Sequence, residues 1–356
     1  MVDNRTGTDR FSHWGIDDAV IRLRSWASDN IHNLPTPPQD VMVGSSDGCP
    51  IRVADPLVSR EHARLTCVDG RWFAIDLSKN GTHLDGVRTR TFALTPGSEI
   101  RVGGSTMLAE SARFVELRMF VGRILGWTVG RLEAVDSALR AIRRASLRRS
   151  ALYLSGDIDL VPIAHSIHRH VWGSDRPFVT CDPRRGDADE SVRSVANKTT
   201  GLAAYDAAVG GSVCVRSERL PPDFPMLLER LRAAESHALL VVVGNDSRDR
   251  HDADVALNPA VHVPPVAERT DELPLVIDHY ALNAAEELHL PDTTFTSEDR
   301  AWVLAHAATS LNEIEKATLR LTALRASRSI SDAAARLRMA PVSLSRWLGR
   351  RELPLS

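Results

Sequence analysis

The chain of 356 residues has few cysteines and no closely spaced cysteine pair. Its four cysteines, Cys49, Cys67, Cys181 and Cys214, are widely scattered, and none shows the Cys-x-x-Cys spacing of zinc or redox sites. We therefore expect reduced cysteines that pack in the interior, as is usual for a cytoplasmic protein. The pattern predicts neither a bound metal nor another cofactor.

Long apolar segments are also missing. The longest purely apolar run, residues 238–243, is far shorter than the roughly 20 residues that span a bilayer. The first ten residues are polar and contain no hydrophobic core of a signal peptide. These absences predict a cytoplasmic protein without a membrane partner.

No sign of charge dominates the sequence. The formal net charge is −2, so the overall charge predicts no nucleic-acid partner and the local distribution has to decide. Hydrophobic residues make up 43% and charged residues 25% of the chain, which is typical of globular proteins. At about 100–200 residues per domain, the length predicts two or three domains.

Three segments of the sequence differ in their predicted secondary structure. Residues 17–116 contain short alternating strands separated by turns such as Asn80–Gly81, a pattern typical of a β-sandwich or barrel. Between residues 130 and 245, strand-like and helix-like stretches alternate, which predicts an α/β domain with a mostly parallel sheet. From residue 274 onward the pattern is helical. The predicted strands are 20–26, 41–44, 63–68, 72–76, 151–154, 177–181, 213–215 and 239–243, and the predicted helices are 131–144, 163–171, 224–234, 275–288, 297–308, 311–326 and two short terminal ones.

The first segment carries a set of short motifs in fixed order. They occupy residues 43–45, 58–63, 76–82, 85–87 and 96–103. In order and spacing they resemble a forkhead-associated (FHA) domain, which implies a β-sandwich whose loops bind phosphothreonine peptides. We place this domain at residues 17–118, after an N-terminal tail of residues 1–16.

The resemblance also implies binding residues. Ser59 and Arg60 would touch the phosphate, and Asn80 would hold the peptide backbone. Lys79 stands where the family often has Thr and could supply a second cation. Hydroxyl and guanidinium donors suit a group with nearly two negative charges and three acceptor oxygens. By the same resemblance, Gly44 and His62 are structural, and His62 ties the binding loop to the sandwich.

Ser45 departs from the family pattern, in which an Arg follows the Gly of this strand. A charge-assisted contact worth roughly 1.5–3 kcal/mol would then be missing, unless Arg52 or Lys79 compensates for it. The alternative is a sandwich that keeps its fold but has lost its affinity for phosphopeptides.

The second segment resembles the AAA+ domain of bacterial enhancer-binding proteins, the activators of the sigma-54 form of RNA polymerase. The resemblance rests on colinear stretches at residues 130–132, 155–156, 163–169, 176–182, 205–213, 242–246 and 263–275. It implies a P-loop NTPase-like fold at residues 119–273 and a helical lid at residues 274–328.

Nearly every catalytic element of that family is absent. A P-loop needs glycines, a Lys for the phosphates and a Ser or Thr for magnesium, but residues 156–162 contain no Lys. They do contain Asp157 and Asp159, which would repel phosphate. Arg216 replaces a Walker B acid, and Asn312 stands where the sensor II Arg is expected. We therefore predict a pseudo-ATPase rather than an enzyme.

Two further elements of the family are missing. No Arg stands around Val255 as a finger residue, and residues 190–204 lack the loop that contacts sigma-54. We therefore expect no remodelling of sigma-54 polymerase. The Asp157 and Asp159 pair also suggests a metal site, but two carboxylates without further ligands are more simply a solvated loop.

The last segment, residues 329–356, resembles the Fis-type helix-turn-helix of the same proteins. Ser331 is the expected N-cap of its first helix, and Pro341 suits the start of the second. Arg338 replaces the usual Gly of the turn. Only Asp332 offsets a local excess of basic residues between positions 316 and 351, which fits an electrostatic footprint for DNA.

Positions on the second helix suggest the contacts. Ser343, Arg346 and Arg350 should face the bases or phosphates of double-stranded DNA. Trp347 is either a packing residue or a further DNA contact. The alternative is an arginine-rich, solvated helical tail.

Together these resemblances imply a multidomain bacterial transcription regulator with an all-β FHA sandwich, a degenerate AAA+ scaffold and an all-α C-terminal part. It would read phosphothreonine from a Ser/Thr kinase pathway and bind DNA as a homo-oligomer, with a dimer favoured. The alternative is a phosphopeptide-binding signalling adaptor with a vestigial helix-turn-helix. A third possibility, an active sigma-54 activator, needs residues that the chain lacks.

Overall fold

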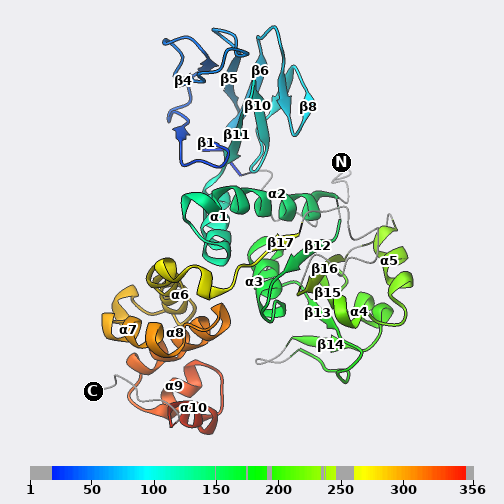
Figure 1. Cartoon of the computed structure of the whole chain (residues 1–356), viewed down its shortest axis with the longest axis vertical. Coiled ribbons are helices and arrows are strands. Elements are labelled where there is room, and N and C mark those ends of the chain that lie inside the picture. Colours follow the sequence, from blue (N-terminus) through cyan, green and yellow to red (C-terminus); the bar gives the residue numbers. More distant parts are fainter. Residues whose placement is uncertain are drawn as a thin grey trace.

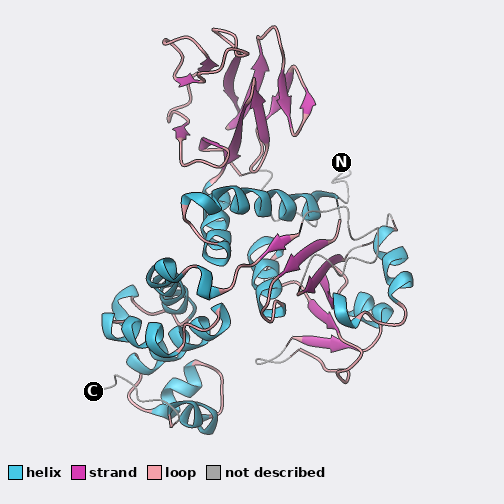
Figure 2. Ribbon diagram, in the orientation of Figure 1, coloured by secondary structure: helices cyan, strands magenta, loops and turns pink. Residues whose placement is uncertain are grey.

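The computed structural model describes residues 18–148, 150–173, 175–190, 195–233, 236, 238–245 and 260–349. Figure 1 shows a β-sandwich at one end, an α/β unit and a group of helices that ends the chain. Figure 2 shows that strands occupy the first unit, that helices flank the sheet of the second, and that the third is helical.

The sandwich consists of two sheets. One has the strand order β2-β1-β11-β10-β7-β8 and the other the order β4-β3-β5-β6-β9. Its strands are β1 (Arg22–Ser25), β2 (Ile31–Asn33), β3 (Val41–Gly44), β4 (Ile51–Arg52), β5 (Ala63–Val68), β6 (Arg71–Asp76), β7 (Thr82–Leu84), β8 (Val87–Arg88), β9 (Thr91–Ala93), β10 (Glu99–Val102) and β11 (Ser105–Glu110). Side chains such as Leu23, Leu65 and Val102 fill the space between the sheets and form a core of their own. The four predicted strands of this segment match β1, β3, β5 and β6 to within two residues.

Two helices follow the sandwich directly, α1 (Ala112–Leu125) and α2 (Leu132–Arg148), joined by the short turn η1 (Val129–Arg131). The Ser111 hydroxyl accepts a hydrogen bond from the Phe114 amide (3.1 Å) and starts α1 immediately after β11. The predicted domain boundary at residue 118 therefore falls inside α1. Buried residues of α1 and α2 belong to the core of the α/β unit rather than to that of the sandwich.

The α/β unit has one six-stranded sheet of order β14-β13-β15-β16-β12-β17, in which every described pairing is parallel. Its elements are β12 (Leu152–Ser155), α3 (Val161–Trp172), β13 (Phe178–Cys181), β14 (Ala196–Lys198), α4 (Gly201–Ala207), β15 (Ser212–Arg216), η2 (Ser217–Arg219), α5 (Phe224–Arg232), β16 (Leu239–Gly244) and β17 (Val261–His262). Alternate strand residues pack under α1, α2 and α3 on one face and under α4 and α5 on the other. The expected α/β fold is confirmed, although β14, β17 and α4 were not predicted.

The helical part contains η4 (Val266–Glu268), η5 (Thr270–Glu272), α6 (Leu273–Glu287), η6 (Asp292–Thr294), α7 (Ser297–His306), α8 (Leu311–Arg325), α9 (Ile330–Arg336) and α10 (Pro341–Leu348). Its buried residues form one continuous core with α1, α2 and α3. Among the residues that the structure describes, no helix combines the length and apolar content needed to cross a membrane.

Candidate functional site

Two loops of the sandwich contain the residues that the sequence predicted to bind phosphate. One joins β4 to β5 and carries Ser59 and Arg60, and the other joins β6 to β7 and carries Lys79 and Asn80. Both lie at the end of the sandwich that points away from α1 and α2 (Figure 1).

The first loop is fixed by close backbone contact with the end of β3. A Cβ atom on Gly44 would lie 2.1 Å from the Arg60 carbonyl oxygen, so no other residue fits there without a shift. The Ser45 amide donates to the Ser59 carbonyl (3.0 Å), and the Ser45 hydroxyl donates to the Val58 carbonyl (3.0 Å). Ser45 therefore stabilises the loop but supplies no charge.

His62 anchors the same loop from below. Its side chain is fully buried, and its Nδ1 accepts a hydrogen bond from the Ser59 amide (3.1 Å). Burial lowers the pKa of His62, which keeps the ring neutral and able to accept this bond. The structural role predicted for His62 matches this contact.

Asp76 organises the second loop. Its Oδ1 accepts hydrogen bonds from the Ser78 amide (3.1 Å), the Ser78 hydroxyl (2.7 Å) and the Thr82 hydroxyl (2.9 Å). Burial tends to raise the pKa of Asp76, but these hydrogen bonds from Ser78 and Thr82 outweigh it and hold the pKa below its usual value. The carboxylate is therefore ionised and keeps the loop in one conformation.

The two loops are joined by hydrogen bonds between them. The Asn80 side-chain amide donates to the Leu57 carbonyl (2.9 Å), and the Lys79 amide approaches the Ser59 hydroxyl at 3.4 Å. The structure thus brings Ser59, Lys79 and Asn80 together, with Arg60 beside them.

The charge of this surface is uncompensated. Arg60 and Lys79 are exposed, and neither forms an ion pair with any residue that the structure describes. Arg52, the other cation considered, pairs with Asp47 (3.0 Å). Two free cations beside a hydroxyl and an amide, all on braced loops, can bind a dianion with several acceptor oxygens.

The second candidate site is the carboxyl edge of the parallel sheet, where ligands usually bind in α/β folds. The Asp159 carboxylate lies just before α3 and accepts hydrogen bonds from Arg216 at the end of β15 (2.7 Å) and from the Val161 amide (3.3 Å). A helix N-terminus in this position commonly holds a phosphate. Here a protein carboxylate already takes that place.

Two further contacts close this edge. The Asn312 side chain, on α8, donates to the Asp159 carbonyl (3.3 Å) and so links the helical part to the loop after β12. At the next strand, Arg219 pairs with Asp182 (3.3 Å). Among the described residues, no cluster of three or more His, Cys, Asp or Glu side chains is arranged to hold a metal ion.

The third candidate site is the helix pair α9–α10. Its first helix is capped by Ser329, whose hydroxyl accepts from the Asp332 amide (3.1 Å). The prediction of Ser331 as the cap is therefore wrong, because the N-cap of the helix lies two residues earlier, at Ser329. Arg338 adopts a left-handed backbone (φ +48°) in the turn between the two helices, and this lets the Met339 N–H close the turn on the Ala334 carbonyl (2.9 Å).

Trp347 is a packing residue. It is 8% exposed, its ring meets Trp302 edge-on with centroids 5.9 Å apart, and Arg320 lies over it at 5.1 Å. Its prediction as a DNA contact is therefore corrected. The signal was available in the sequence, because Trp347 is three residues from the buried Leu344 and so lies on the same face of the helix.

The exposed face of α10 carries Val342, Ser345 and Arg346. Arg346 was predicted to lie there, whereas Val342 (67% exposed) and Ser345 were missed. Ser343 is half-buried, and Arg350 lies outside the described residues.

Comparison with known proteins identifies one of these units. The FHA domain family model matches residues 41–103, which include the two loops that carry Ser59, Arg60, Lys79 and Asn80, so the chain contains an FHA domain. No curated protein matches the chain in sequence.

Several solved structures resemble the same unit. Mycobacterium tuberculosis Rv1747 FHA-1 is 27% identical over 26% of this chain and 98% of that chain, with a TM-score of 0.22. M. tuberculosis EmbR in complex with a low affinity phosphopeptide is 25% identical over 26% of this chain and 24% of that chain (TM-score 0.25). The FHA domain of the CT664 protein from Chlamydia trachomatis is 25% identical over 25% of this chain and 95% of that chain (TM-score 0.24).

Proposed function

We propose that this protein is a transcription regulator that reads phosphothreonine through its FHA domain and binds DNA through α9–α10. The α/β unit and its helical neighbour serve as a scaffold of AAA+ type without ATPase activity. The observation that carries the proposal is the pair of uncompensated cations, Arg60 and Lys79, beside Ser59 and Asn80.

The phosphothreonine part follows from charge and rigidity. FHA domain homologues bind phosphothreonine peptides, and the loops that would do so here are held by Gly44, His62 and Asp76. Because these loops are already ordered, binding costs little conformational entropy. The phosphorylated partner would come from a Ser/Thr kinase pathway.

Removal of one phosphate contact tests this part. Arg60→Ala should weaken binding of a phosphothreonine peptide by roughly tenfold or more, since a hydrogen bond to a charged group is worth about 1.5–3 kcal/mol. Arg64→Ala, an equal charge change on β5 outside the loops, is the matched control and should bind as the wild type does. Equal affinity for the phosphorylated and unphosphorylated peptide would contradict the proposal.

The scaffold part is supported by the contacts at the sheet edge. Asp159 occupies the N-terminus of α3 and pairs with Arg216, so an added phosphate would meet a negative charge there. We expect no ATP turnover by the purified protein. Saturable turnover that is lost on changing Arg216 would refute this.

The DNA-binding part is supported by the exposed face of α10. Arg346 lies there with Val342 and Ser345, while Leu344 and Trp347 fix the helix on the core. A recognition helix of this kind typically reads paired half-sites as a dimer. We expect the wild-type chain to enrich a two-fold-symmetric motif from random duplex DNA, and to bind it less tightly as salt increases.

Two variants make this test specific. Arg346→Ala should abolish the enrichment, whereas Arg113→Ala, which removes an exposed Arg from α1, should retain it. If no motif is enriched and only weak, salt-sensitive retention remains, the alternative holds: a phosphopeptide-binding adaptor with a vestigial helix-turn-helix.

A further inference from the structure

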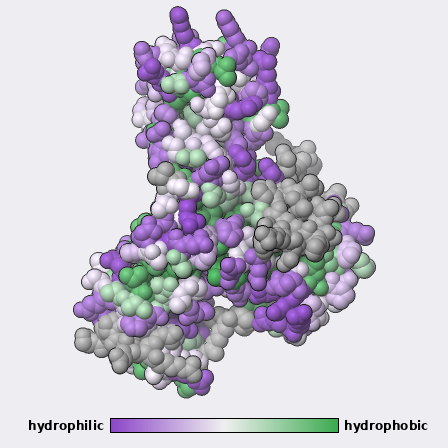
Figure 3. Space-filling view, viewed as in Figure 1, coloured by the Kyte–Doolittle hydropathy of each residue, from purple (hydrophilic) through white to green (hydrophobic). Residues whose placement is uncertain are grey.

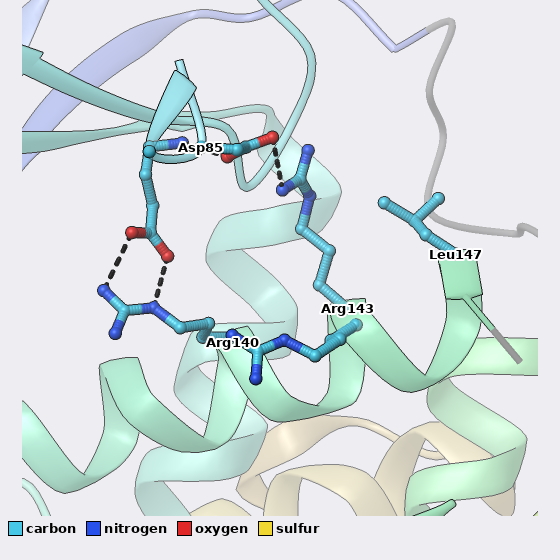
Figure 4. A pocket seen from close by; sticks show the side chains of 7 residues that line it. Asp85, Arg140, Arg143 and Leu147 are labelled. Atoms are coloured by element: carbon cyan, nitrogen blue, oxygen red, sulfur yellow. Dashed lines mark hydrogen bonds and ion pairs between the residues drawn. The ribbon is translucent and has the colours of Figure 1, made fainter. Parts of the chain in front are cut away.

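A pocket of about 310 Å³ lies where the sandwich meets α2, and Figure 4 shows it from close by. The β7–β8 turn and the start of β10 form one wall, and the second half of α2 forms the other. Its lining residues are Asp85, Gly86, Glu99, Arg140, Arg143, Arg144 and Leu147. Three guanidinium groups thus face two carboxylates.

Arg140 is fully engaged. Its Nε and Nη2 both bind the Glu99 carboxylate, the second at 2.8 Å, and its guanidinium lies 4.1 Å from the centre of the Trp26 ring. A bidentate pair that is also stacked on an aromatic face is a strong contact. Arg140 and Glu99 therefore form a fixed wall of the pocket.

Arg143 is held more weakly. A single bond joins its Nη1 to Asp85 (3.0 Å), whose side chain is 38% exposed, and its Nη2 is 3.4 Å from the Ser98 hydroxyl. Figure 4 shows Arg143 reaching from α2 to the Asp85 carboxylate. A single, partly exposed pair of this kind contributes little free energy, although the Arg143 side chain itself is only 16% exposed.

Arg144 is the unused cation. It is half-buried beside Arg143, and no ion pair or hydrogen bond joins it to any residue in the described part of the chain. A half-buried guanidinium without an anionic partner has lost hydration without compensation. The pocket therefore offers one free cation and one that is weakly held.

We propose that this pocket binds a phosphate dianion between Arg143 and Arg144, with Asp85 displaced from Arg143. A dianion can bind both guanidinium groups, whereas the single charge of Asp85 reaches only one. The ligand is a phosphate ester or free phosphate, and the site is separate from the Ser59 and Arg60 loops. The proposal does not depend on the function assigned to those loops.

Occupancy would affect how the sandwich is attached. The sandwich has its own core and is joined to α2 through polar contacts: Asp85 to Arg143, Glu99 to Arg140, and the buried pair of Arg24 with Asp136. Release of Asp85 from Arg143 removes one of these ties and leaves the other two. The β7–β8 turn would keep its own hydrogen bonds, from the Glu99 amide to the Asp85 carboxylate (2.9 Å) and from the Asp85 amide to the Glu99 carbonyl (2.9 Å).

Calorimetric titration of the full chain with inorganic phosphate, at constant ionic strength, tests the proposal. In Arg60→Ala, which disables the loop site, phosphate should still bind saturably. Adding Arg144→Ala should weaken that binding at least about fivefold, as expected for loss of a charge-assisted contact. Unchanged phosphate affinity in the double variant, or no saturable binding in Arg60→Ala, would overturn the proposal.

A second variant separates binding from damage to the fold. Asp85→Asn removes the competing carboxylate and should tighten phosphate binding, an effect that a misfolded protein cannot produce. Weaker or equal binding in Asp85→Asn would also contradict the proposal. Repeating the titration in Arg60→Ala with a phosphothreonine peptide identifies the source of the ligand: tighter binding than inorganic phosphate indicates a phosphoprotein, and equal binding indicates free phosphate.

Discussion

The loop end of the FHA sandwich and the carboxyl edge of the parallel sheet both gather loops at the end of a rigid sheet, and both present arginines there. At the sandwich, Arg60 and Lys79 have no acidic partner among the described residues. At the sheet edge, Arg216 is paired with Asp159 and Arg219 with Asp182. A basic side chain therefore indicates an anion site only when no acidic side chain is paired with it.

The two regions also differ in how their local sequence relates to the site. In the sandwich, residues of the loops bind one another and the adjoining strand end, so short motifs describe the site. At the sheet edge, the partners Asp159, Arg216 and Asn312 come from three distant parts of the chain. The comparison can be tested by disturbing each region in turn.

The largest effect should come from Gly44→Ala. Its new Cβ would lie 2.1 Å from the Arg60 carbonyl oxygen, so the phosphate loop has to move. We expect the sandwich to lose about 3 kcal/mol of unfolding free energy together with phosphopeptide binding, as measured by denaturant unfolding and peptide titration. Gly48→Ala is the control, because its Cβ would meet only the Ser46 hydroxyl at 3.9 Å. Wild-type stability in Gly44→Ala would show that the loop is not braced as described.

The next effect concerns pH and the α/β unit. Burial lowers the pKa of His168 to about 4 and outweighs the hydrogen bond between its Nε2 and the Arg176 carbonyl (3.0 Å), which raises the pKa. The Nδ1 of His168 lies 2.8 Å from the Ser212 hydroxyl. The folded protein binds this proton less readily than the unfolded chain, so stability falls as pH falls from about 6.5 toward 4. The total loss from this group is on the order of 3 kcal/mol.

Denaturant unfolding of the full chain at pH 7 and pH 5, followed by tryptophan fluorescence, checks this effect, since Trp172 lies next to His168. His168→Gln should flatten the pH dependence, whereas His289→Gln, at an exposed position, should leave it unchanged. The sandwich should respond less, although burial lowers the pKa of His62 in the same direction. A pH dependence that survives in His168→Gln would assign it to another group.

The smallest change in stability should come from Asp159→Ala. This variant tests directly whether an unpaired arginine at the sheet edge creates an anion site. The pair with Arg216 is partly exposed (24% and 55%), so its loss should cost below about 1 kcal/mol. The variant removes the carboxylate that Arg216 and the N-terminus of α3 share, and phosphate binding beyond that of the wild type should appear in a titration. Asp157→Ala is the control. If Asp159→Ala binds no more phosphate than the wild type, an unpaired arginine at the sheet edge is not sufficient to form an anion site.

Much of the fold could be predicted from sequence, because it depends on local patterns. The strands β3, β5 and β6 and the helices α7 and α8 follow from alternation and helical periodicity. The helix α1 was missed, although Phe114, Leu117 and Val121 have helical spacing, because the sandwich was expected to continue to residue 118. Its polar cap Ser111 is the residue that separates the two units.

The candidate sites were predictable to different degrees. Ser59, Lys79 and Asn80 were found together because their loops carry contiguous motifs. The Asp159 and Arg216 pair could not be found, since it joins residues 57 positions apart. Trp347 and Ser331 were misassigned because burial and capping depend on where the helix begins and on which face meets Trp302.

We propose that the uncompensated loop surface of the sandwich selects phosphothreonine. The most direct measurement is the binding of the full wild-type chain to a degenerate library of phosphothreonine peptides, compared with the same library after phosphatase treatment. We predict saturable retention of the phosphorylated library only, and its loss in Arg60→Ala. Equal retention of both libraries, or of neither, would contradict the account.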